Sequence, residues 1–206
     1  MKNNINIPSY NLGVYTIPDT CLKDVCVDIG ANVGDFTVNQ ASHFALVHYY
    51  EPYTPCYQRA AEKTSQLSNV VGWNEAVYES DDAVVSLVAH SNYDAGSNAI
   101  KTDLLNGDWA EEIQQVKTVS LPTILKRVGG HINYLKVDCE TSEYSLFMNQ
   151  DLTEIDYIGT ELHWQIGEER YNDLITHVCK THTCSEDLKW LHGYNREVTF
   201  TNKKLA

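Results

Sequence analysis

The chain has few prolines, few basic residues and no long apolar segment. Only 5 of its 206 residues are proline, and no Gly/Ser-rich or repeated segment occurs, which excludes fibrous, disordered and solenoid proteins. No apolar run approaches the roughly 20 residues that span a bilayer. The polar start Met1–Asn6 also lacks the basic-then-apolar layout of a signal peptide. We therefore expect a soluble, cytoplasmic protein that binds no membrane.

Positive charge is scarce. The chain has 15 Lys and Arg against 28 Asp and Glu, which leaves a formal net charge of −13. Such a surface repels a phosphate backbone, so we expect no nucleic-acid partner and an acceptor that is neutral or cationic. The 6 cysteines are even in number, but a chain of this length does not depend on a disulfide framework. We expect them to be free thiols.

Strand and helix patterns alternate along most of the chain. Residues 1–206 form one predicted domain, with 1–20 as a lead-in. The predicted strands are 25–29, 45–50, 69–73, 83–89, 131–138, 155–162, 183–188 and 197–201, and the helical patterns cover 33–44, 54–67, 121–128, 141–148 and 168–180. This order predicts a doubly wound α/β fold, Rossmann-like, with a mostly parallel sheet, helices on both faces and an antiparallel C-terminal strand pair.

One segment interrupts the alternation. Residues 90–115 are rich in Ser, Asn, Asp and Gly, and we predict that they form no core element. Long irregular segments in compact domains are often functional. Because this one lies between strand ends, we interpret it as a substrate-side loop.

The turn after the first predicted strand has two glycines and an acidic residue. Asp28, Gly30 and Gly34 form the spacing D-x-G-x-x-x-G, which differs from the dinucleotide pattern G-x-G-x-x-G. A carboxylate before the first glycine suits an ammonium group better than a pyrophosphate. Glu51 stands 17 positions past Gly34, at the end of the second strand, where a carboxylate can accept both ribose hydroxyls. These residues together indicate an adenosyl compound.

The order of six motifs resembles the class I S-adenosylmethionine-dependent methyltransferases, and most closely the FkbM-type family. The motifs are VDIGANVGDF from Val27, YEP from Tyr50, NEAV from Asn74, VSLPTIL from Val119, LKVDCETSE from Leu135 and TELH from Thr160. The resemblance implies S-adenosyl-L-methionine as cofactor. It also implies that Asp28, Gly30, Asn32 and Gly34 line its methionine end, that Glu51 holds the ribose, and that Asn74, Glu75 and Ala76 flank the adenine.

The family usually reads D-x-E-G-x-E where this chain has Asp138-Cys139-Glu140-Thr141-Ser142-Glu143. Both glutamates are present, but threonine replaces the glycine. We expect O-methylation of a small molecule or sugar, and a hydroxyl acceptor needs a group that takes its proton. The candidates are Asp138, Glu140, Glu143 and His163, of which Glu140 and His163, behind Asp138, are favoured.

No metal is expected, because no clear oxygen-ligand spacing occurs. The run from His177 to Cys184 contains zinc-ligand residue types, but it passes from helix to strand and its side chains would diverge. Two other functions stay open. One is a nucleotide-dependent oxidoreductase, which the missing G-x-G-x-x-G disfavours. The other is a cofactor-binding domain without turnover, for which Thr141 is the one hint and against which Glu140 and Glu143 argue.

Overall fold

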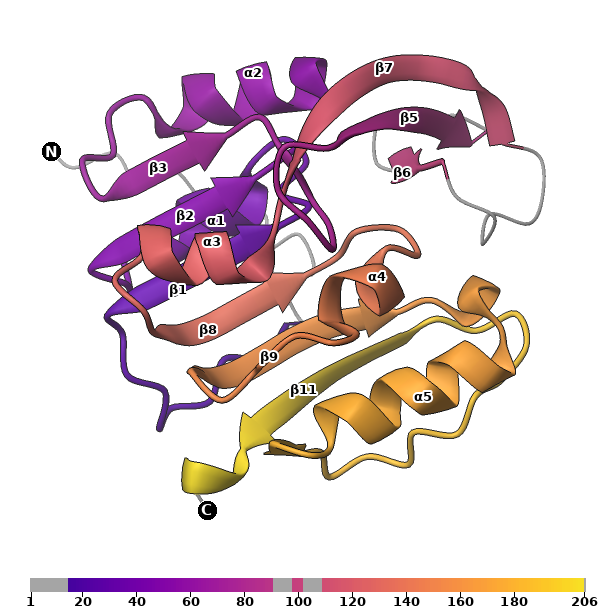
Figure 1. Cartoon of the computed structure of the whole chain (residues 1–206). Coiled ribbons are helices and arrows are strands. Elements are labelled where there is room, and N and C mark those ends of the chain that lie inside the picture. Colours follow the sequence, from indigo (N-terminus) through magenta and orange to yellow (C-terminus); the bar gives the residue numbers. More distant parts are fainter. Residues whose placement is uncertain (1–14, 91–97, 102–108, 206) are drawn as a thin grey trace, which may run out of the picture.

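A computed structural model describes residues 15–90, 98–101 and 109–205 (Figure 1). In these ranges a seven-stranded sheet has the order β10-β11-β9-β8-β1-β2-β3. Its strands are β1 (Val25–Ile29), β2 (Leu46–Tyr50), β3 (Val70–Trp73), β8 (Ile132–Val137), β9 (Ile155–Leu162), β10 (His182–Thr183) and β11 (Arg196–Asn202). From β3 to β9 all neighbours are parallel, and β11 runs antiparallel to β9 and to β10. The predicted fold class is confirmed, although β10 is shorter than the predicted strand 183–188.

Helices cover both faces of this sheet (Figure 1). On one face, α3 (Leu121–Arg127), α4 (Glu143–Phe147) and α5 (Glu168–Val178) pack in one core cluster with the side chains of Val27, Leu135 and Ile158. On the other, α1 (Asp35–Gln40) and α2 (Thr54–Thr64) contribute Phe36 and Ala60 to clusters that include Cys26, Val47 and Tyr49. Neighbouring residues of β1 thus enter different clusters, as the two-residue period of a strand requires. Two short 3-10 helices are η1 (Trp164–Ile166) and η2 (Lys203–Leu205).

Helix α1 is shorter than the sequence predicts. The apolar spacing continues to Phe44, which is buried, but the helix ends at Gln40. The side-chain amide of Asn69 donates hydrogen bonds of 2.8 Å to the carbonyls of Ala41 and Phe44. These carbonyls lie past the helix end and find their partner in Asn69, so the chain can turn into β2 without unpaired backbone groups.

A second, smaller sheet adjoins the first. It consists of β4 (Ala76–Val77), β7 (Trp109–Val119), β5 (Val84–His90) and β6 (Asn98–Ile100), in that order. Strand β5 was predicted, but β6 and most of β7 fall in the segment 90–115, and Ile100 of β6 is buried in a hydrophobic cluster, so the prediction that this segment forms no core element is wrong there. Strand β7 pairs antiparallel with β5, and along it Val116 is buried while Ile113 is 38% exposed. The polar composition of β7 is that of a strand with one face buried and one face in solvent. Residues 91–97 and 102–108 of that segment lie outside the described residues.

All six cysteines fall within the described ranges and are free thiols, as predicted. In the same ranges, no helix is long and apolar enough to cross a membrane.

Candidate functional site

The carboxyl ends of β1, β2, β8 and β9 meet at one edge of the large sheet, where doubly wound folds bind ligands. The backbone N–H groups of Gly30 and Ala31 donate to the carbonyl of Tyr50, at 3.0 and 3.1 Å. Gly30 has a φ of +74°, and a Cβ on it would lie 1.7 Å from the carbonyl oxygen of Asp138. The loops after β1 and β8 therefore approach so closely that only glycine fits at this position.

Gly34 has a different role from Gly30. It begins α1 with a φ of +83°, and a Cβ there would lie 2.9 Å from the Cβ of Ala60 in α2. Gly34 thus permits close packing of α1 on α2, and it lines neither of the two pockets described below. Of the predicted methionine-end residues, Gly30 and Asn32 line these pockets.

Asp28 lies beneath the glycine turn, fully buried. Its Oδ2 accepts a 2.6 Å hydrogen bond from the hydroxyl of Thr37, and its Oδ1 lies 3.2 Å from the Nζ of Lys136. The same Nζ donates to the carbonyl of Gly30 at 2.7 Å. The structure therefore places Asp28 as a support of the turn, paired with a buried lysine, and it lines neither pocket.

Lys136 was not singled out in the sequence, although it is the one charged residue of β8, a strand that is buried throughout. A lysine in such a strand requires a buried partner, and that is the signal that could have found it. Burial opposes its charge, but the carboxylates of Asp28 and Asp138 outweigh burial and raise the pKa of Lys136 above its usual value.

Glu51 follows β2 and lines the pocket beside Gly30. One carboxylate oxygen accepts the N–H of Asn32 and the other the N–H of Tyr53, both at 2.8 Å. Asn32 takes a left-handed φ of +51°, which turns its N–H toward Glu51. Burial raises the pKa of Glu51 to about 7, and the two backbone N–H groups act against that rise.

The predicted adenine-flanking residues divide into two kinds. The side-chain amide of Asn74 donates to the carbonyls of Glu51 and Pro52, so it fixes the chain after β2. Glu75 and Ala76 line the pocket. Glu75 forms a forked ion pair with Arg127 of α3, and the guanidinium of Arg127 lies 3.8 Å from the ring centre of Trp73. Arg127 was not predicted.

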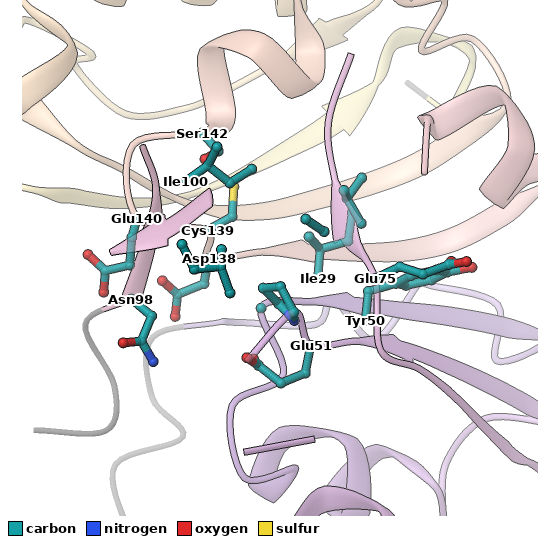
Figure 2. A pocket seen from close by; sticks show the side chains of 15 residues that line it. Ile29, Tyr50, Glu51, Glu75, Asn98, Ile100, Asp138, Cys139, Glu140 and Ser142 are labelled. Carbon is teal, nitrogen blue, oxygen red and sulfur yellow. The ribbon is translucent and has the colours of Figure 1, made fainter. Parts of the chain in front are cut away.

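Figure 2 shows the pocket that these residues share. The carboxylates of Asp138 and Glu140 gather at one end with the amide of Asn98, and Tyr50 and Glu75 lie at the other. Asn98 and Ile100, from β6, show that part of the segment 90–115 reaches this pocket. A second pocket adjoins the first, and Gly30 and Asp138 line both. The second pocket is otherwise lined by Tyr15, Ala31, Asn32, Val33, Asp35, Phe36, Lys136, Glu161 and Glu197.

The four predicted proton acceptors lie together. The Nδ1 of His163 is 3.0 Å from Oε1 of Glu143, and its Nε2 is 3.4 Å from Oε2 of Glu140 and 3.8 Å from Oε2 of Glu161. Glu143 and His163 are buried, whereas the side chains of Asp138 and Glu140 are 30% and 25% exposed. Burial disfavours the imidazolium form, but the carboxylates of Glu143 and Glu140 outweigh it and hold the pKa of His163 well above its usual value.

The threonine that replaces the family's glycine stands in a glycine-like conformation. Glu140 and Thr141 have φ values of +47° and +76°, a region that costs a side-chain-bearing residue about 1–2 kcal/mol. The turn thus keeps its left-handed form despite the replacement, which brings Glu140 and Glu143 to the same imidazole.

One protein family matches most of the chain. The family described as the methyltransferase FkbM domain matches residues 28–195. No curated protein matches the chain.

Solved structures share the fold at low sequence identity. A fibrillarin pre-rRNA processing protein of Methanococcus jannaschii is 7% identical with a TM-score of 0.53, covering 92% of this chain and 70% of that one. A ribosomal protein L11 methylase of Lactobacillus delbrueckii subsp. bulgaricus is 9% identical with a TM-score of 0.50, covering 90% and 73%. These likenesses show the fold alone. The family match spans most of the chain, and we conclude that the protein belongs to the FkbM family of S-adenosylmethionine-dependent methyltransferases.

Proposed function

We propose that the protein transfers the methyl group of S-adenosylmethionine to a hydroxyl oxygen of a small molecule or sugar. The observation that carries this proposal is the position of Asp138 and Glu140, whose carboxylates line the same pocket as Gly30 and Glu51. A group that can take a proton therefore adjoins the place where the cofactor fits. A hydroxyl acceptor needs such a group, because its oxygen must lose a proton as it gains the methyl group.

The residues of the pocket fit the cofactor. The missing Cβ of Gly30 lets the loops after β1 and β8 meet at the pocket, and the carboxylate of Glu51 can accept hydrogen bonds from two ribose hydroxyls. When bound, the cofactor supplies an electrophilic methyl group on a positively charged sulfur. Glu75 and Ala76 then line the adenine end, and Asn74 positions Glu51 through its backbone.

We assign the proton to Glu140. Its side chain is a quarter exposed and lines the pocket, whereas Glu143 is buried and holds His163. Asp138 also lines the pocket, but Lys136 lies 3.7 Å from its Oδ2 and compensates part of its charge. Glu140 would take the proton of the acceptor hydroxyl as its oxygen gained the methyl group that the bound cofactor would supply, and S-adenosylhomocysteine would keep the electron pair of the carbon–sulfur bond.

The second pocket offers space for the acceptor. It shares Gly30 and Asp138 with the first pocket, and its other charged residues are mostly acidic. An acidic lining repels anionic acceptors, which favours a neutral sugar or a cationic small molecule. Asn98 and Ile100 line the first pocket beside Asp138 and Glu140 and do not line the second, so the substrate-side role that we propose for the segment 90–115 rests on its position next to the proposed proton acceptor.

Calorimetric titration with S-adenosylhomocysteine, followed by a methyl-transfer screen over hydroxylated small molecules and sugars, tests the proposal. We expect micromolar binding by the wild type, and we expect Glu140→Gln to keep this binding while losing most turnover. The matched control is Glu169→Gln, at an exposed position of α5, which should match the wild type in both assays. Full turnover by Glu140→Gln would reject its role, and a screen that methylates only amines would reject hydroxyl transfer.

A further inference from the structure

We propose that Asp138, Glu161 and His163 bind a divalent cation at the boundary of the two pockets. One donor atom from each of these residues lies within 4.8 Å of the others. Asp138 follows β8, and Glu161 and His163 stand at the end of the neighbouring strand β9. Donor atoms bound to one ion at about 2.1 Å lie roughly 3–4 Å apart, so small side-chain rotations are enough to close this set around an ion.

His163 is oriented as a ligand. Its side chain is 1% exposed, and Glu143, fully buried, lies against its Nδ1 at 3.0 Å. A carboxylate on Nδ1 fixes a proton there, so an ion that displaced the proton of Nε2 would meet a lone pair directed away from Glu143, the usual arrangement of a metal-binding histidine. Nε2 faces Glu161 and Glu140 at 3.8 and 3.4 Å.

The carboxylates of Glu161 and Asp138 also contact residues outside the three proposed ligands. Asn195 donates a 2.9 Å hydrogen bond to Oε1 of Glu161, which leaves Oε2 facing His163. Lys136 lies 3.7 Å from Oδ2 of Asp138. The hydroxyl of Tyr15 also hydrogen-bonds the Asp138 carboxylate, so a bound ion would compete with Tyr15 and Lys136 for Asp138.

The charges around the imidazole also call for a cation. Asp138, Glu140, Glu143 and Glu161 surround it, and Lys136 already lies against buried Asp28. A divalent ion would compensate this excess of negative charge. The two carboxylates suit Mn²⁺, Mg²⁺ or Ca²⁺, and the imidazole nitrogen favours a first-row transition ion over Mg²⁺ and Ca²⁺, so we use Mn²⁺ as the probe.

The sequence spacing did not reveal this site, because its residues come from two strands and only β8–β9 pairing brings them together. The role of the ion rests on the methyl transfer proposed above. Held next to Glu140, a bound cation would take the acceptor hydroxyl oxygen as a further ligand and make its proton easier to remove. The binding itself needs neither cofactor nor acceptor.

Titration of the whole chain with Mn²⁺ alone, followed by electron paramagnetic resonance of the free ion, tests the proposal. We expect one saturable site of micromolar affinity and, in pulsed spectra of bound Mn²⁺, coupling to one ¹⁴N nucleus. Asp138→Asn and Glu161→Gln should each weaken binding at least about tenfold, which is 1.4 kcal/mol. Glu169→Gln and Asp173→Asn, on the acidic surface of α5, should leave it unchanged.

Thermal melts check that each variant is folded. The ¹⁴N coupling is measured on the wild type, so that test does not depend on any variant folding. Absence of a saturable site, absence of nitrogen coupling, or equal weakening by the α5 controls would each overturn the proposal. Titration of the same sample with S-adenosylhomocysteine separates the two proposals. Cofactor binding without Mn²⁺ binding rejects only the cation site, whereas Mn²⁺ binding without cofactor binding rejects only the proposed methyl transfer.

Discussion

Glu51 is ionised only in part near neutral pH, because burial raises its pKa to about 7. Ribose hydroxyls donate hydrogen bonds, so they bind the ionised carboxylate better than the protonated one. With a pKa near 7, the ionised fraction falls about tenfold between pH 8 and pH 6. We therefore predict that the affinity for S-adenosylhomocysteine falls about tenfold over that interval.

Calorimetry at pH 6, 7 and 8 measures this dependence. Glu51→Gln should bind more weakly than the wild type at pH 8 and should show no comparable change with pH, because an amide does not titrate in this range. A wild-type affinity that stays constant from pH 6 to pH 8 would mean that Glu51 does not govern cofactor binding.

Gly30 is the residue at which the smallest change should have the largest effect. In Gly30→Ala the new Cβ would overlap the carbonyl oxygen of Asp138, and the backbone would keep a φ of +74°. Conformational strain and overpacking together should lower the free energy of unfolding by at least about 3 kcal/mol. Cofactor binding should be lost as well, since the loops after β1 and β8 must separate.

Gly129→Ala provides the matched comparison in chemical denaturation. Gly129 has a φ of +89°, but nothing lies within 4 Å of a Cβ added there. This variant should lose only the conformational part, about 1–2 kcal/mol. Equal losses in the two variants would show that contact with Asp138 contributes nothing.

Strands β1 and β8 are joined by charge as well as by backbone hydrogen bonds. Asp28 and Lys136 are direct partners in the parallel register of these strands, and both side chains are buried. Lys136→Met keeps the length of the side chain but leaves Asp28 buried without its cation. Removing one partner of a buried pair costs about 3–5 kcal/mol, so we predict a loss of that size in the free energy of unfolding.

The double variant Asp28→Asn with Lys136→Met distinguishes pairing from packing. It removes both charges, so it should recover at least half of the loss caused by Lys136→Met alone, as measured by urea denaturation. If the two substitutions were simply additive, the ion pair would not be the reason for the loss.

Sequence patterns predicted elements well where burial is uniform and poorly where it is not. Strands β1, β2, β3, β8 and β9 were found because they are short apolar runs between turn residues. Strand β7 was missed because one of its faces is solvated. Helix α1 was predicted too long because the carbonyls after Gln40 accept hydrogen bonds from Asn69, a residue distant in the sequence. The site shows the same limit. Asp138 and Glu140 were visible in one motif, whereas the pairing of Lys136 with Asp28 and the approach of Asp138 to His163 depend on strand neighbours.

At the scale of the whole molecule, net charge distinguishes anionic acceptors such as RNA from neutral or cationic ones, which the fold does not distinguish. The structural likeness to a pre-rRNA processing protein concerns the fold, and a chain with 15 basic and 28 acidic residues has little to offer a phosphate backbone. The second pocket adds Asp35, Glu161 and Glu197 to one basic residue, Lys136, which is already paired. Both observations favour an uncharged or cationic acceptor.

We therefore predict that a labelled single-stranded RNA of about 20 nucleotides binds more weakly than about 100 µM at 0.15 M salt, the weak end of non-specific binding. Fluorescence anisotropy measures this, with a basic RNA-binding protein as positive control. Lowering the salt to about 0.05 M strengthens binding wherever phosphate contacts release counterions, so it provides the more demanding condition. Micromolar affinity that weakens as salt rises would require a basic surface that overcomes the net charge of −13, and the acceptor would then have to be sought among nucleic acids.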